Sequence, residues 1–224
     1  MSKLETNVFL KKFIDSNGKV DYKELQENSL LIEKISEIES KNLADCSSRD
    51  EELVFWLNAY NLLVLKGVLE KLKKNPNWNG TKTYLTRVSF FVLKKFTVAN
   101  TKISLYNLEN KILRKKFKDP RIHFVLNCAS SSCPVIPSSL FEIDTLEQTL
   151  DNYTKIFIND SSNVNIIAST NQLKLNPIFK WYKKDFDNQG GILNFIKKYH
   201  ENFPTAMNNP RISFLRYNWS LNSQ

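Results

Sequence analysis

The most apolar stretch of the chain is Leu53–Leu65, where only Asn58 and Asn61 interrupt the hydrophobic residues of a predicted helix over 50–73. A helix that is apolar on nearly every side is buried rather than amphipathic. The preceding segment Ser47–Glu52 supplies capping serines and acidic residues, which favour the positive end of a helix dipole. The sequence therefore predicts a central helix that lies in the core.

Asn58 and Asn61 lie three residues apart, and therefore on one face of this helix. A buried carboxamide that has no hydrogen-bond partner costs about 1–3 kcal/mol. We therefore expect both side chains to bind specific partners elsewhere in the protein.

Periodicity, turn residues and capping residues predict the other elements. The expected helices cover residues 6–15, 23–43, 105–117 with Ser104 as the cap, 146–157 after the capping-box pattern Asp144–Glu147, and 191–199 after Gly190 and Gly191. The expected strands cover 88–93, 96–98, 121–127, a hairpin of 163–169 with 172–175, and a closing strand over 211–217.

No low-complexity linker divides these elements, and 224 residues suffice for one large core. The predicted fold is a single α+β domain over residues 1–224. Several helices surround the buried central helix, beside a small, mainly antiparallel sheet.

Two positions carry polar groups where the pattern expects burial. Glu109 falls inside the apolar arc of the helix over 105–117, so its carboxylate is either paired or functional. In the strand expected over 121–127, alternation places Arg121, His123 and Asn127 on the same face.

The segment Arg121–Pro134 carries the strongest candidate chemistry. Cys133 precedes Pro134, and proline favours the first turn of a helix, where backbone N–H groups lower a thiol pKa. His123 would accept the thiol proton, and Glu109 or an asparagine would orient the imidazole. The alternative is structural, with His123 a satisfied core histidine and Cys133 an inert small hydrophobe.

Two other interpretations use the same segment. His123, Cys128 and Cys133 are spaced H-x4-C-x4-C, slightly wider than usual zinc spacings, and Glu109 would be a fourth ligand. Cys128 and Cys133 would otherwise form a transient redox disulfide.

Composition restricts the function further. The chain has a net charge of +9, but the lysines and arginines are scattered and accompany no nucleic-acid-binding motif, so we expect no nucleic-acid partner. It has 5 glycines and no glycine-rich phosphate loop, and we expect no cofactor. The absence of a leader-like N-terminus and of eighteen consecutive apolar residues predicts a cytoplasmic protein without a membrane partner.

The run Phe179–Phe186 interleaves aromatic residues with lysines. Such a run is typical of an amphipathic segment that covers a core, which we favour. It is also compatible with a surface that binds an anionic or stacked ligand.

Taken together, these segments resemble the domain of unknown function 547 family over about residues 8–221. The resemblance rests on several motifs: Gly18–Tyr22, Phe55–Asn61, Ser104–Arg114, Arg121–Pro134, Ile178–Phe186 and Tyr217–Asn222. The family pattern matches at eight polar or sulfur-bearing positions: Asn58, Asn61, Glu109, Arg114, Arg121, His123, Cys128 and Cys133. The resemblance implies a functional site at these positions, but it names no activity.

The leading hypothesis is a thiol-dependent hydrolase or acyl or amide transferase, with Cys133 as nucleophile, His123 as general base and Glu109 as the orienting carboxylate. Arg121 or Arg114 would bind an anionic group of a small-molecule or peptide substrate. The remaining candidates are supporting residues: Asn58, Asn61, Asn127, Cys128 and Ser132. The alternative is a non-catalytic domain that binds an anionic peptide or metabolite.

Overall fold

The structure is a computed structural model that describes residues 8–224. Its helices are α2 (Tyr22–Leu25), α3 (Ser29–Ser40), α4 (Arg49–Lys74), α5 (Tyr84–Arg87), α6 (Leu105–Asn107), α7 (Leu146–Asn159), α8 (Ile178–Trp181), α9 (Lys183–Asp187) and α10 (Ile192–Tyr199). Its strands are β1 (Lys95–Val98), β2 (Thr101–Ser104), β3 (Val164–Ile167), β4 (Gln172–Leu175) and β5 (Arg211–Phe214).

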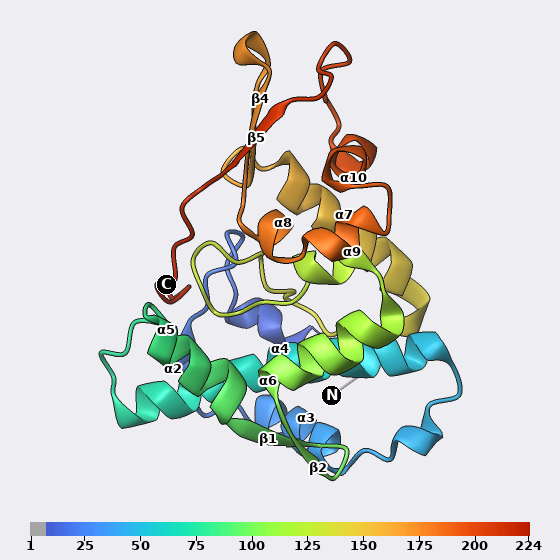
Figure 1. Ribbon diagram of the computed structural model, residues 1–224. Helices are drawn as coiled ribbons and strands as arrows, with labels where there is room; N and C mark the ends of the chain where they lie inside the picture. Colours follow the sequence, from blue (N-terminus) through green and yellow to red (C-terminus); the bar gives the residue numbers. More distant parts are fainter. Residues whose placement is uncertain (1–7) are drawn as a thin grey trace.

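Helix α4 is the predicted central helix, and it runs across the lower half of the molecule (Figure 1). Its 26 residues begin after Ser48, whose side chain accepts a hydrogen bond from the backbone N–H of Glu51. By length and composition alone α4 could cross a membrane, but 67% of its most apolar window is buried inside the protein. It is therefore the core helix that its apolar pattern indicates.

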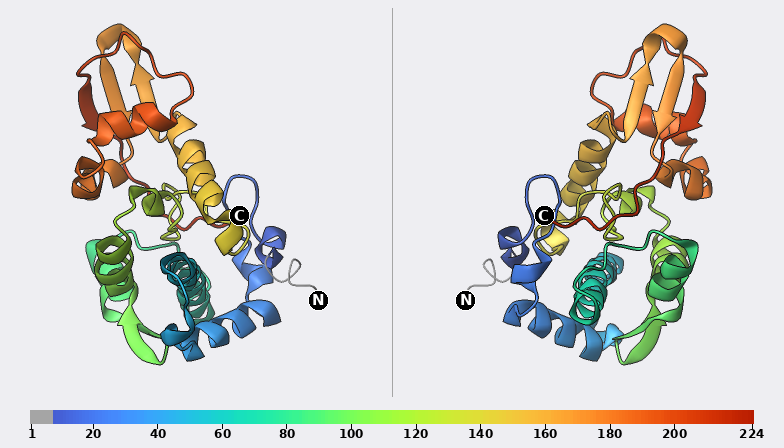
Figure 2. Two further views of the ribbon diagram at one scale, coloured as in Figure 1. Left: turned by 90° about the vertical axis from the view of Figure 1, so that its right-hand side faces the viewer. Right: turned by 90° about the vertical axis from the view of Figure 1, so that its left-hand side faces the viewer.

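Two hydrophobic cores lie one above the other. The first surrounds α4 and includes α3, β1 and the segment after Ser104. The second packs α7 to α10 beneath the three-stranded sheet, and the rings of Phe124, Phe157, Phe179, Phe186 and Phe195 contact one another there. Figure 2 shows this sheet at one end of the molecule, with α3 and the β1–β2 pair at the other. The α+β architecture agrees with the sequence prediction.

Both sheets are small. Strands β1 and β2 pair antiparallel, as do β3 and β4, so the predicted hairpin is confirmed. The closing strand is shorter than predicted, ends at Phe214, and pairs in parallel with β4.

Two predicted strands are wrong. Helix α5 begins at a capping box between Thr83 and Thr86. Residues 88–93 continue it as a π-helical segment. Residues 121–127 begin as a 3-10 helix over Pro120–Phe124, because Asp119 accepts a hydrogen bond from the backbone N–H of Arg121 and Pro120 starts the helical turn. Alternation therefore does not place Arg121, His123 and Asn127 on one face.

Three predicted helices differ in their bounds or in their caps. The helix expected over 23–43 is interrupted at Asn28, which caps α3 by accepting a hydrogen bond from the N–H of Leu31. The helix expected over 6–15 is a 3-10 turn over Phe9–Lys12, and residues 6–7 lie outside the described part of the chain. Helix α7 begins at Leu146 after a 3-10 turn, without the predicted side-chain cap.

The helix expected over 105–117 exists and is capped by Ser104 as predicted. After Asn107 it continues as a π-helical segment over Leu108–Phe117. A π-helix has i→i+5 hydrogen bonds, is rare, and often occurs at functional sites. Here the segment carries Glu109 and Arg114.

The C-terminal tail packs against Gly80. A side-chain carbon added at Gly80 would lie 2.4 Å from the carbonyl oxygen of Trp219 and 2.6 Å from the N of Leu221, and its φ of +84° is left-handed. Asn79 Oδ1 also accepts a hydrogen bond from the N–H of Leu221 (3.1 Å). Only a glycine permits this close backbone approach.

Gly80→Ala should therefore destabilise the protein more than Gly190→Ala. Both substitutions impose a left-handed alanine, at φ +84° and +88°, but the nearest atom at Gly190 lies 3.6 Å away. We expect about 1–2 kcal/mol of backbone strain in each variant, and about 1–3 kcal/mol more at Gly80 from steric overlap. Denaturant unfolding measures both losses, and equal losses would contradict the packing of the tail on Gly80.

Candidate functional site

Two asparagine side chains of α4 hold the long loop after Phe124. Asn61 Nδ2 donates to the carbonyl of Val125 (2.8 Å), and its Oδ1 accepts from the backbone N–H of Asn127 (3.0 Å). Asn58 makes the same pair of bonds with the N–H and carbonyl of Phe141 (2.8 and 3.0 Å). The predicted need of both amides for specific partners is thereby confirmed, and the partner is the backbone at each end of the loop.

Asn127 then folds the loop back on itself. Its Oδ1 accepts from the N–H of Ala129, and its Nδ2 donates to the carbonyl of Pro134, both at 2.7 Å. Ala129 adopts a left-handed φ of 57°, which reverses the chain. This turn brings Cys128 next to Cys133.

The two thiols touch. Cys133 Sγ donates to Cys128 Sγ across 2.8 Å, and the backbone N–H of Cys128 donates to Cys133 Sγ, also at 2.8 Å. Both cysteines are free thiols. The prediction that Cys133 lies at a helix N-terminus is wrong, because Pro134 begins no helix and the loop continues to Ile143. Its local backbone donor is a single N–H from Cys128.

The surroundings of the two thiols shift their pKa values in opposite directions. Burial raises the pKa of the Cys128 thiol, but hydrogen bonds of its sulfur with Cys133, Ser130 and Tyr217 outweigh burial and lower this pKa to about 7. Burial and the neighbouring Cys128 sulfur raise the pKa of Cys133 well above its usual range. The pair therefore loses its first proton near neutral pH and holds the second.

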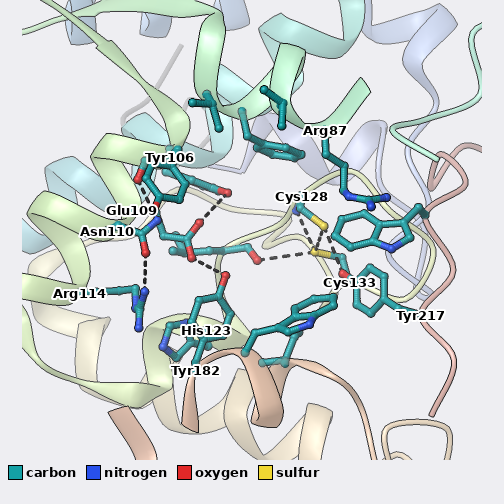
Figure 3. Close-up of a pocket in the computed structure, with 18 of the residues that line it drawn as sticks. Arg87, Tyr106, Glu109, Asn110, Arg114, His123, Cys128, Cys133, Tyr182 and Tyr217 are labelled. Atoms are coloured by element: carbon teal, nitrogen blue, oxygen red, sulfur yellow. Dashed lines mark hydrogen bonds between the residues drawn. The ribbon is translucent and has the colours of Figure 1, made fainter. Parts of the chain in front are cut away.

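The thiols face a cavity of about 450 Å³ (Figure 3). Most of its lining is apolar or aromatic, although Arg87, Glu109, Asn110, Arg114 and His123 also contribute. The remaining lining residues are Tyr60, Tyr84, Val88, Phe91, Val92, Tyr106, Leu126, Ile178, Trp181, Tyr182, Tyr217 and Trp219. A cavity of this size and lining is typical of a site for a small ligand or a few side chains.

His123 lines the same cavity, but its hydrogen bond goes elsewhere. Nε2 lies 2.8 Å from Asp185 Oδ2, and the imidazole stacks on the ring of Tyr182 at 3.8 Å between centroids. Burial lowers the pKa of His123 below its usual range, so the neutral ring donates to Asp185. Among the described residues, no hydrogen bond joins His123 to either thiol, and Figure 3 shows them on opposite sides of the cavity.

Glu109 is held by two phenols. The hydroxyl of Tyr182 donates to Oε1 (2.5 Å), and that of Tyr60 donates to Oε2 (3.4 Å). Burial and the Glu109 charge raise the pKa of both tyrosines well above the usual range, so both remain donors. Glu109 is thus paired with phenols, and the carboxylate that contacts the imidazole is Asp185.

The two candidate arginines lie in different places. Arg114 lines the cavity and forms a two-pronged ion pair with Asp185 (2.7 and 3.2 Å). Burial disfavours ionisation of Asp185, but hydrogen bonds from His123 and Arg114 lower its pKa to about 2. Arg121 lies outside the cavity lining and binds the carboxylates of three other residues: Asp119, Glu147 and Asp151.

Ser132 supports the loop rather than the cavity lining. Its Oγ accepts from the backbone N–H of Asn218 (2.9 Å), and its carbonyl accepts from Asn176 Nδ2 (3.0 Å). The N–H of Ser131 also donates to the carbonyl of Ser220 (2.8 Å). These bonds bring the C-terminal tail, with Tyr217 and Trp219, to the thiols.

The zinc interpretation finds no matching geometry. Over residues 8–224, no three His, Cys, Asp or Glu side chains are arranged to hold a metal ion. The two thiols meet as that hypothesis required, whereas the imidazole of His123 binds Asp185.

Sequence reasoning missed Asp185, Tyr182 and Tyr217 as site residues. Tyr182 and Asp185 belong to the run Phe179–Phe186. Within it, Phe179 and Phe186 are buried in the second core, while Trp181 and Tyr182 line the cavity. The available signal was the family resemblance, which included both C-terminal motifs.

The family described as "Protein of unknown function, DUF547" matches residues 44–158, just over half of the chain. The chain belongs to this family. The match to DUF547 includes both thiols, His123 and Glu109, and it ends before Asp185 and Tyr217. No curated protein and no solved structure matches the chain.

The electrostatic difference between the thiols predicts their alkylation. The rate at which iodoacetamide labels Cys128 should rise with pH around a midpoint near 7, because its pKa is lowered to about 7. Cys133 should stay slow, and so should Cys46, whose pKa is raised by burial. Labelling is followed for each cysteine by peptide mass spectrometry.

Two substitutions at Cys133 provide the matched control. Cys133→Ala removes the S–H donor to Cys128 and should move the labelling midpoint upward, whereas Cys133→Ser retains a donor and should move it less. Equal shifts, or faster labelling of Cys133 than of Cys128 in the unmodified protein, would contradict this assignment.

Proposed function

We propose that this DUF547 protein catalyses thiol–disulfide exchange, with Cys128 as the attacking thiol and Cys133 as the resolving thiol. The observation that carries the proposal is the 2.8 Å contact between the two sulfurs at a ligand-sized cavity. An acidic attacking thiol beside a less acidic partner is the arrangement that exchange requires.

The exchange has two steps. The Cys128 thiolate attacks one sulfur of a substrate disulfide, so a mixed disulfide forms and the other substrate sulfur leaves as a thiolate. Cys133 then gives up its proton and attacks Cys128 Sγ, which forms the Cys128–Cys133 disulfide and releases the second substrate sulfur, to which that proton passes. The substrate disulfide is reduced and the protein dithiol is oxidised. A thiol reductant regenerates the dithiol.

Acyl or amide transfer through Cys128 is the second candidate. The sequence hypothesis instead named Cys133 as the nucleophile, but burial and the Cys128 sulfur raise the pKa of Cys133 well above its usual range. Acyl transfer needs a base beside the sulfur and unoccupied N–H donors for the developing oxyanion. The imidazole of His123 binds Asp185, and the loop N–H groups of Cys128, Ala129, Ser131, Ser132 and Cys133 all have acceptors already. These bonds favour exchange over acyl transfer.

A binding domain for an anionic ligand is the other alternative. Its expected anchors, Arg114 and Arg121, are both ion-paired with carboxylates of the protein itself. An anionic ligand would have to displace these carboxylates, which weakens this alternative.

The proposal is tested by measuring how much the protein accelerates the reduction of a disulfide by dithiothreitol. We expect Cys128→Ser to abolish turnover. Cys133→Ser mixed with the disulfide alone, before dithiothreitol is added, should stop after one mixed disulfide at Cys128, visible by mass spectrometry. Acyl transfer predicts instead that Cys133→Ser retains turnover of an activated ester, and a binding domain predicts no turnover in any form. Cys46→Ser is the matched control and should behave like the unmodified protein.

A further inference from the structure

One wall of the cavity is an apolar helix that faces solvent. Residues Tyr84–Leu93, which comprise α5 and the π-helical segment, form a continuous apolar helix, yet only Phe90 among them is buried. Leu85 is 77% exposed and Leu93 is 68% exposed. Large apolar side chains on an exposed surface are informative when they cluster.

The exposed side chains do cluster, and they do so at the cavity. Tyr84 and Val92 on this helix are both exposed and line the cavity, and so are Tyr106 and Trp181 on its other walls. Leu85 and Leu93 lie outside the cavity lining, but each is next in sequence to a lining residue of the same helix, Tyr84 and Val92. We call the six exposed residues the apolar rim: Tyr84, Leu85, Val92, Leu93, Tyr106 and Trp181.

We propose that the apolar rim binds an extended polypeptide segment in which apolar side chains flank a disulfide-bonded cysteine. This inference rests on the proposed thiol–disulfide exchange and names its substrate class. The cysteine sulfur reaches Cys128 inside the cavity, and the flanking side chains cover the rim.

The extent of the rim selects a polypeptide over a small disulfide. A small molecule would be enclosed within the cavity of about 450 Å³ and would leave Leu85 and Leu93 uncovered. A polypeptide reaches the cavity and the outer face of the helix at once. A flat lipid surface would contact the rim, but it brings no sulfur to the thiols.

The charges at the cavity agree with this choice. Arg114 is paired with Asp185, and the Arg87 guanidinium lies over the Trp219 ring while it donates to the carbonyls of Thr81 and Lys82. Arg114 is thus neutralised by a carboxylate, and Arg87 is stacked on a ring and bonded through Nη1 to two backbone carbonyls. Apolar contact is therefore the main contribution that the rim offers to recognition.

Two synthetic peptides test the inference. Each carries one central cysteine in a disulfide with 5-thio-2-nitrobenzoate, flanked in one peptide by Leu and Phe and in the other by Ser and Gly. We expect Cys128 to release the coloured thiolate from the apolar peptide faster, on the order of tenfold. The double substitution Leu85→Ser with Leu93→Ser should bring the ratio of the two rates towards one.

Ile32→Ser is the matched control, since Ile32 is 62% exposed on α3 and does not line the cavity. It should leave the ratio unchanged. Equal rates for the two peptides in the unmodified protein would overturn the inference. So would sedimentation with phosphatidylcholine vesicles that depends on Leu85 and Leu93 while the peptide rates stay equal, because the rim would then bind a membrane.

A further reagent separates this inference from the proposed function. Free 5,5′-dithiobis(2-nitrobenzoate) is a small disulfide whose reaction at Cys128, followed by peptide mass spectrometry, does not require the apolar rim. If it reacts with Cys128 and the peptides show no difference, the inference about the rim fails and the exchange chemistry stands. If neither this reagent nor the peptides react at Cys128, both fail.

Discussion

The site depends on the carboxamide of Asn61. This side chain is buried on the central helix. It donates to the carbonyl of Val125 and accepts from the N–H of Asn127, at the start of the loop after Phe124. The backbone fixed in this way positions Asn127, whose own amide closes the loop around both cysteines. A rigid helix therefore sets the separation of two sulfurs that lie 2.8 Å apart. Removal of the amide would leave a buried N–H and a buried carbonyl without partners, which costs about 1–3 kcal/mol each.

Burial and hydrogen bonds together explain why the pKa values of the two thiols differ. A buried thiolate is unfavourable unless hydrogen bonds compensate. At Cys128 the sulfur has hydrogen bonds with the second thiol, with the hydroxyl of Ser130 and with the phenol of Tyr217, which lies on the C-terminal tail. Burial raises the pKa of Tyr217 well above its usual range, so the phenol keeps its proton and remains available as a donor. The same desolvation keeps the second proton on Cys133.

The sequence predicted the parts of the site that local rules control. An apolar helix that contains two amides implied a central helix with specific partners for those amides. Glu109 inside an apolar arc implied a carboxylate that is either paired or functional, and the structure shows it paired with two phenols. The contacts of His123 were not predictable, because Asp119 and Pro120 turned an alternating segment into a 3-10 helix. The pairing of His123 with Asp185 spans 62 positions, and no local pattern specifies contacts at that separation.

We infer that the loop makes Cys128 and Cys133 one redox couple. The most direct measurement is equilibration of the protein in glutathione buffers from reducing to oxidising, followed by acid quenching and peptide mass mapping. We expect one reversible Cys128–Cys133 disulfide, with Cys46 still a free thiol at the same buffer ratio. Stable glutathione adducts on Cys128 and Cys133 separately, with no disulfide between them at any ratio, would contradict it.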